Sequence, residues 1–268
     1  MKNLFFTIAK YLRIYRALFK ASFIADLEYR ANFAIRIVTD VFWYAGQIIT
    51  FEALFQHTKL IGGWNIYQMR VFIGVIFLVD AVYMVLFHDN MDQVSEKVRK
   101  GQMDLLLAKP VNSQFMVSLY RASTALMGNL LIAAGWLTYA LYTLPDFSAI
   151  RLLWLILVIP SGIFTLYTIR FVIATTAVIF TKADSIQYLW YNFYRLGMRP
   201  DRIYQPWLRY FLMTFVPVSL IASVPAKFLL ETPSIESISF ILIVPLLFFW
   251  AGHKFWLYAL SKYSSASS

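Results

Sequence analysis

Long apolar runs separated by short polar segments dominate the chain. The clearest run has no charged residue from Ala122 to Pro145, and the next, residues 152–181, is interrupted only by Arg170. A transmembrane helix needs about 20 mostly apolar residues, and six segments approach this length when runs with a few charges are included. The pattern predicts spans at residues 33–56, 70–88, 115–144, 152–181, 207–226 and 237–260.

Composition supports a chain that lives in lipid. Hydrophobic residues make up 60% of the 268 residues and charged residues only 14%, with a mean hydropathy of +0.63. Soluble domains are about 45–50% apolar and about 25% charged. We therefore expect an all-α polytopic membrane protein that forms one transmembrane domain over residues 1–268.

The basic residues set the expected orientation. The net charge is +10, but the Lys and Arg residues lie between apolar blocks, where they meet lipid headgroups, so we do not expect nucleic-acid binding. With the N-terminus placed inside, the outer segments hold only Lys59, Arg70, Arg151 and Lys227. The positive-inside rule therefore predicts that both termini are cytoplasmic, which agrees with an even number of spans.

Residues 1–30 have the pattern of an interfacial amphipathic helix. Apolar residues recur there at spacings of three and four, and basic residues fall on another face. The apolar residues are Ile8, Leu12, Tyr15, Phe19 and Phe23, and the basic ones are Lys10, Arg13 and Lys20. Such a helix would lie on an anionic membrane surface, either as a solvated lead-in or as a brace that transmits force.

The loop at residues 89–114, between the second and third expected spans, contains a short charged helix. Its acidic residues come first and its basic residues last, which suits the helix dipole, and Gly101 is placed to end it. Met91, Val94 and Val98 form an apolar ridge at spacings of three and four. Such a ridge could dock into a groove on a partner, or the helix could be a solvated connector.

Two prolines eight residues apart interrupt the fifth apolar run. Proline removes a backbone donor and clashes with the preceding helical turn, so Pro217 and Pro225 favour a broken or re-entrant helix before the last span. Such backbone survives at membrane depth only when it is buried in protein or lines a cavity. The alternative is an ordinary kinked span.

Four charges fall within the expected spans: Arg36, Asp40, Asp80 and Arg170. Charges at membrane depth are costly and often functional, so they are candidates for a translocation pathway. In the alternative, they are structural. Arg36 and Asp40 would then form an intrahelical pair, and Arg170 would reach the interface or pair with Asp80.

The sequence offers no enzyme chemistry of its own. It has no Gly-Lys dipeptide and hence no Walker A loop. Its three histidines lack metal-ligand spacing, and it has no cysteine. We expect no catalytic residue, no metal site and no cofactor on this chain.

Two segments carry a resemblance to a known family. The stretch Arg99-Lys-Gly-Gln-Met-Asp-Leu-Leu-Leu-Ala-Lys-Pro110 and the stretch from Pro217 to Ala226 resemble the permease subunits of ABC-2 type ATP-binding-cassette exporters, in particular a branch of small six-span permeases. Gln102 stands where that branch commonly has an acid, and Met103 where it commonly has leucine.

The resemblance implies a mechanism. Two permeases, identical or homologous, would pair around a pathway in the bacterial cytoplasmic membrane, and two ATPase subunits carrying ATP and Mg²⁺ would bind below. Pro217 and Pro225 would belong to an outer gate. The docking surface would comprise Met91, Val94, Glu96, Lys97, Val98, Arg99, Lys100, Gly101, Asp104 and Pro110.

Two other function classes remain open on the residues alone. One is a secondary transporter or channel, which would use the four charges within the spans. The other is a membrane-embedded enzyme or assembly factor without transport.

Overall fold

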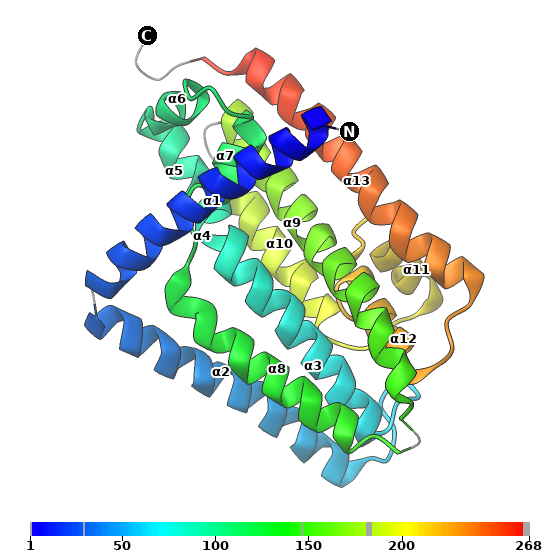
Figure 1. Cartoon of the computed structure of the whole chain (residues 1–268). Coiled ribbons are helices and arrows are strands. Elements are labelled where there is room, and N and C mark those ends of the chain that lie inside the picture. The colour runs from blue at the N-terminus through cyan, green and yellow to red at the C-terminus, as the bar shows by residue number, and fades with distance from the viewer. Residues whose placement is uncertain (1, 29, 146, 181–183, 265–268) are drawn as a thin grey trace.

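The computed structural model describes residues 2–28, 30–145, 147–180 and 184–264, and all regular elements in these ranges are helices (Figure 1). In chain order they are α1 Lys2–Glu28, α2 Arg30–His57, α3 Ile66–Tyr83, the π-helical turn η1 Met84–His88, α4 Asp89–Asp92, α5 Val94–Arg99, α6 Gln102–Leu107, α7 Ser113–Leu119, η2 Thr124–Leu126, α8 Met127–Tyr142, η3 Ala149–Trp154, α9 Leu155–Phe180, α10 Asp184–Gly197, η4 Asp201–Ile203, α11 Pro206–Thr214, η5 Val218–Leu220, α12 Ser223–Leu230 and α13 Ile235–Lys262. The all-α prediction is confirmed.

Within the described ranges, four helical stretches are long and apolar enough to cross a membrane. They are Ile66–Arg99, Thr124–Tyr142, Ala149–Phe180 and Ile235–Lys262. The first joins α3, η1, α4 and α5 into a 34-residue helix, so the charged helix expected as a separate element of the loop is instead the end of this one. Two further helices are not among these four stretches. Helix α2 carries three charged side chains beyond its first residue, and α10 has only 14 residues.

Helices α3 and α9 form the centre of the bundle. Helix α3 packs against α8, α9 and α12, and α13 packs along α9. Glycines allow the closest approaches: a Cβ on Gly74 would lie 2.9 Å from the Cα of Leu137 in α8, and one on Gly252 would lie 3.1 Å from Val172 in α9. Small residues at helix contacts let van der Waals packing hold membrane helices together.

The helix expected over residues 115–144 is interrupted. Helix α7 ends at Leu119, and α8 begins only after an irregular stretch that includes Arg121. Asn90 donates to the Arg121 carbonyl at 2.6 Å and accepts from its N–H at 3.0 Å. The Ser123 N–H donates to the Val85 carbonyl at 2.9 Å. The break is stable because these contacts satisfy backbone groups that leave the helix.

The segment around Pro217, where a span was expected at 207–226, is not one straight helix. Helix α11 and the η5–α12 stretch meet at a bend of 73°. Arg202 before the bend and Glu231 after it form an ion pair of 3.9 Å, so the segment returns to the end of the molecule at which it started. The two prolines led us to expect a broken or re-entrant helix, and the bend confirms that the helix is broken. We call residues 201–231 the hairpin.

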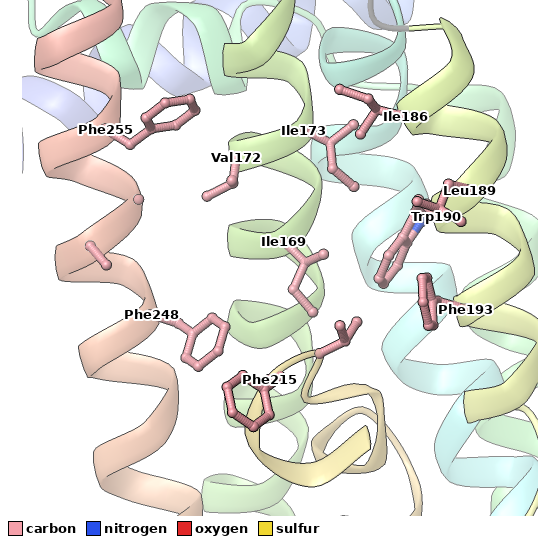
Figure 2. A pocket seen from close by; sticks show the side chains of 13 residues that line it. Ile169, Val172, Ile173, Ile186, Leu189, Trp190, Phe193, Phe215, Phe248 and Phe255 are labelled. Atoms are coloured by element: carbon pink, nitrogen blue, oxygen red, sulfur yellow. The ribbon is translucent and has the colours of Figure 1, made fainter. Parts of the chain in front are cut away.

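Helix α10, which the apolar pattern did not predict, brings the chain to that end. It runs antiparallel to α9, with Ile186 beside Ile173 and Phe193 farther along toward Phe215 (Figure 2). Ile203, which follows α10, lies against the loop between α2 and α3: a Cβ on Gly62 in that loop would lie 2.9 Å from it. The chain therefore passes from the end where α9 finishes to the end where α3 starts.

Helix α1 lies across the opposite end of the bundle, from the start of α2 toward the end of α13, so α1 starts and α13 ends there (Figure 1). It packs on η2 and α2. The ring of Tyr11 meets Phe115 edge-on at 4.8 Å, while Phe6 and Leu12 remain 72% and 63% exposed. The helix thus has one attached face and one free apolar face.

Candidate functional site

A polar cavity of about 370 Å³ opens between α2, α3, α9 and α10. Its lining residues are Trp43 and Gln47 of α2, Asp80, Tyr83, Met84 and His88 of α3 and η1, Leu166 and Arg170 of α9, and Trp190, Tyr191, Tyr194, Arg195 and Met198 from α10 onward. Two of the four predicted intramembrane charges, Asp80 and Arg170, meet at this cavity.

Asp80 is held by a tyrosine. The Tyr194 hydroxyl donates to Oδ1 of Asp80 at 2.8 Å, and Asp80 is 9% exposed. The alternative pairing of Asp80 with Arg170 is wrong, because Arg170 forms its ion pair with Asp92 of α4.

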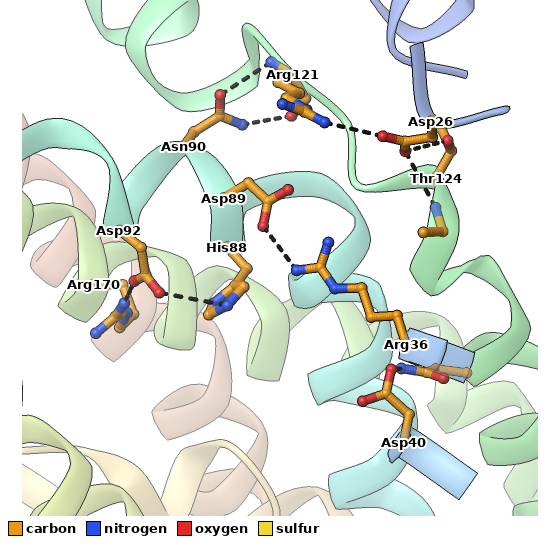
Figure 3. A network of polar contacts seen from close by, with 12 residues as sticks. Asp26, Arg36, Asp40, His88, Asp89, Asn90, Asp92, Arg121, Thr124 and Arg170 are labelled. Carbon is orange, nitrogen blue, oxygen red and sulfur yellow. Dashed lines mark hydrogen bonds and ion pairs between the residues drawn. The ribbon is translucent and has the colours of Figure 1, made fainter. Parts of the chain in front are cut away.

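Arg170 is 3% exposed and has several partners (Figure 3). Besides its contact with Asp92, Nε donates to the Tyr83 hydroxyl at 3.1 Å, and the guanidinium lies 5.5 Å from the centre of the Tyr191 ring. Its Nη1 has no hydrogen-bond partner among the described residues. A buried unpaired donor is costly, so this atom has unused binding capacity.

Arg36 and Asp40 lie near the cavity but do not line it. They do not form the intrahelical pair that their spacing allows. Arg36 reaches Asp89 at 3.3 Å, and Asp40 accepts from Asn129 of α8 at 2.7 Å (Figure 3). Both residues therefore join α2 to its neighbours.

A second polar cluster joins α1 to the irregular stretch between α7 and α8. Asp26 accepts from Arg121 at 3.0 Å and from the Thr124 hydroxyl at 2.6 Å (Figure 3). Burial alone would raise the pKa of Asp26, but the bonds from Thr124, Arg121 and the Ala125 N–H outweigh it and lower the pKa below its ordinary value. The carboxylate form is therefore the one that anchors α1.

The tip of the long helix differs from the expected docking ridge. Met91, Val94 and Val98 are 1–3% exposed, and α4 and α5 pack against α9, so these side chains fill the chain's own core. Met103 is also buried. They present no apolar ridge to a partner.

The free surface of the tip is charged. Glu96, Arg99 and Lys100 are exposed, as are Lys109 and Pro110, and Leu105 is 70% exposed. The half-buried Lys97 lies 5.7 Å from the Tyr120 ring centre.

Gly101 reverses the chain at this tip with a φ of 69°, a conformation that favours glycine. Asp104 in α6 lies beside Tyr263 at the end of α13. There, burial and the neighbouring carboxylate raise the pKa of Tyr263 to about 12. The tip is therefore folded back against the C-terminal helix.

The hairpin, at the end of the bundle away from the tip, is closed by one buried carboxylate. Arg209 and Lys227 each donate to Oδ2 of Asp201 at 2.9 Å, and the Asp201 side chain is 1% exposed. Pro217 and Pro225 are both buried in the hairpin. Pro225 is tolerated because it lies in the first turn of α12, where its missing N–H costs least.

An apolar groove of about 420 Å³ lies on the other side of α10, against α9 and α13 (Figure 2). It has no charged lining residue, and phenylalanines such as Phe193, Phe248 and Phe255 project into it. Trp190 lines both this groove and the polar cavity. Helix α10 therefore separates an oily groove from a charged cavity.

Several residues of the polar cavity and of the polar contacts beside it were not predicted. Tyr191 and Tyr194 lie on the missed helix α10, whose signal was the spacing of Ile186, Trp190 and Phe193. Asp92 was expected only to favour a helix start, and Asn90 was not singled out.

Comparison with known proteins places these features in a family. Residues 41–267 match the family described as "ABC-2 family transporter protein". The chain belongs to the ABC-2 transporter family. No curated protein and no solved structure matches the chain significantly. As an ABC-2 family member with several membrane-length helices, the chain is a multi-pass membrane protein of the ABC permease type. The matched region contains the polar cavity, the charged tip and the hairpin, while α1 precedes it.

Proposed function

We propose that this ABC-2 family chain is the permease subunit of an ATP-driven exporter whose ATPase resides on separate subunits. The observation that carries the proposal is the charged tip at Glu96–Lys109, which projects at the end of the bundle where α1 starts and α13 ends (Figure 1). A membrane domain without a nucleotide site of its own needs such a surface to receive work from a soluble ATPase that binds ATP and Mg²⁺.

We infer six crossings. Four are the membrane-length stretches that contain α3, α8, α9 and α13. Helix α2 and the shorter α10 run between the same two ends and would complete the count. With α10 as the fifth crossing, Arg199, Arg202 and Arg209 move to the outer side, yet the basic residues of α1 and of the tip keep the excess inside. We infer cytoplasmic termini in a bacterial inner membrane.

A second permease copy would cover the face between α2 and α10. Helix α10 exposes Arg195, which lines the cavity and is poorly suited to lipid, and the cavity-lining Trp43 of α2 and Tyr191 of α10 are exposed as well. Charged groups at membrane depth face protein or water rather than acyl chains. Pairing through this face would turn the polar cavity toward a shared pathway, with the hairpin of Pro217 and Pro225 as its outer gate.

The docking surface is tested by a pull-down of the tagged chain from mild detergent, with mass spectrometry of what accompanies it. We expect an ATPase subunit in roughly equal amount and expect Arg99→Glu/Lys100→Glu to release it. Lys59→Glu is the matched control, because Lys59 is an exposed cation in the loop at the opposite end. Retention of the ATPase by the double variant would disprove the docking assignment.

The same preparation separates this proposal from a secondary transporter or channel. In reconstituted vesicles, an exporter moves its cargo only when ATP and the ATPase are present. Flux driven by an ion gradient alone, lost in Asp80→Asn, would favour the other class.

A further inference from the structure

Asp80 and Arg170 both line the polar cavity together with several aromatic side chains, and they have different partners. We call the side of Asp80 its acidic end and the side of Arg170 its basic end. We propose that it binds a small zwitterion with an apolar body, its ammonium group at Asp80 and its anionic group at Arg170. That this ligand is the transported cargo rests on the proposed function; the binding itself does not.

Asp80 has no ion-pair partner among the described residues, although His88 and Arg195 also line the cavity. The hydrogen bond of Asp80 comes from the neutral hydroxyl of Tyr194, and no Lys, Arg or His forms an ion pair with Asp80 in the described part of the chain. A carboxylate at membrane depth is costly unless a positive group pairs with it. An ammonium group from a ligand would supply that partner.

The basic end has a free donor. Arg170 is 3% exposed, and its Nη1 lacks a partner in the described residues, although Asp92 and Tyr83 engage other atoms of the same guanidinium. Guanidinium groups bind carboxylates and phosphates through charge-assisted hydrogen bonds. A ligand anion that reached Nη1 would bond to a donor that the described residues leave without a partner.

The two ends are not neutralised by each other. Arg170 is engaged by Asp92 and Asp80 by Tyr194, with Tyr83 on the Arg170 side. A ligand with only a positive charge would leave Nη1 unpaired, and one with only a negative charge would leave Asp80 unpaired. A ligand carrying both charges satisfies both ends.

The walls and size limit the ligand body. Trp43, Tyr191 and Trp190 line the cavity, and the first two are 40% and 46% exposed at its mouth. Ligand pockets usually measure about 300–1,000 Å³, so the cavity, at about 370 Å³, suits a molecule of amino-acid size. Aromatic faces attract both rings and ammonium groups.

Three related probes test the inference on the purified chain in detergent, without ATPase, by equilibrium dialysis at neutral pH. L-Phenylalanine carries both charges, phenethylamine only the positive one, and 3-phenylpropionate only the negative one. We expect saturable binding of L-phenylalanine at or below about 1 mM, at least tenfold tighter than either analogue.

Variants then assign each end. Asp80→Asn should weaken the binding of L-phenylalanine and phenethylamine about tenfold and leave the binding of 3-phenylpropionate unchanged. Arg170→Gln should weaken the binding of L-phenylalanine and 3-phenylpropionate about tenfold and leave that of phenethylamine unchanged. If Arg170→Gln does not fold, Asp92→Asn/Arg170→Gln removes both charges of that pair. Asp40→Asn and Arg36→Gln are matched controls, because both side chains lie outside the cavity lining.

Absence of saturable L-phenylalanine binding, equal binding of all three probes, or unchanged selectivity in both cavity variants would overturn the inference. None of these results would affect the ATPase pull-down, so failure here is distinct from failure of the permease assignment.

Discussion

Each end of the bundle is held by a carboxylate, half-buried at one end and buried at the other, but in opposite ways. At the end that carries α1, Asp26 joins this helix to residues about a hundred positions away. At the other end, Asp201 joins Arg209 and Lys227, all within one hairpin. The Asp26 contacts therefore hold separate elements together, whereas the Asp201 contacts close a local unit.

The largest effect should come from Asp201→Ala. Removing a buried carboxylate leaves Arg209 and Lys227 without their counter-charge, and such losses reach about 3–5 kcal/mol. Because Arg209 is 39% exposed, we expect about 3 kcal/mol, seen as a lower melting temperature and faster hydrogen exchange confined to residues 198–231. Glu231→Gln, which removes only the exposed 3.9 Å pair, should cost less than about 0.5 kcal/mol. Faster exchange throughout the bundle would show that the hairpin is not a local unit.

Asp26→Ala should have the next largest effect, about 2 kcal/mol, because it removes charge-assisted bonds from Arg121 and Thr124. Hydrogen exchange should rise in α1 and around residues 120–126 and remain unchanged in the hairpin. Thr124→Val is the graded control, since it removes one of those bonds and should cost about 1 kcal/mol. Unchanged exchange in α1 would contradict the anchoring role of Asp26.

Gly101→Ala should cost about 1 kcal/mol, because an L-residue at a φ of 69° is strained. The expected result is a shifted tip: reduced ATPase retention in the pull-down with a melting temperature close to that of the parent. Gly135→Ala, where an added Cβ meets nothing within 4 Å, is the control. Full retention by Gly101→Ala would show that docking tolerates a displaced tip.

The smallest effect is a pH dependence confined to α1 and its contacts. Because the folded chain lowers the pKa of Asp26, its stabilisation is present above the unfolded value of about 4 and is lost as the pH falls through the folded value. Exchange in α1 should therefore rise below about pH 4, and Asp26→Asn should remove that pH dependence. A pH response that persists in Asp26→Asn would have to come from another group.

The sequence predicted the helices that long apolar runs identify, and it missed a helix that is apolar on one face only. Helix α10 has 14 residues, and its apolar side chains occupy a single face, so averaging over a membrane-length window conceals it. The ridge of Met91, Val94 and Val98 was identified correctly as apolar, but spacing alone cannot say whether a partner or α9 covers it.

Charge pairing was the least predictable part of the site. Spacing showed that Arg36 and Asp40 share a helix face, yet neighbouring helices supply better partners in Asp89 and Asn129. The Asp201 contacts depend on the hairpin path, which brings Lys227 back beside Arg209. Local rules tell which groups need partners, and only the tertiary arrangement tells which partners they find.

The continuity of the helix from Ile66 to Arg99 has a mechanical consequence. Thirty-four residues at 1.5 Å each make a helix of about 50 Å. One end lies at the loop between α2 and α3 and the other at the charged tip. Its joint is the π-helical turn Met84–His88, and both of those residues line the polar cavity. Helices bend most readily at π-helical turns. Under the proposed function, force applied at Arg99 would therefore bend the helix beside the cavity and change the cavity's shape around Asp80 and Arg170.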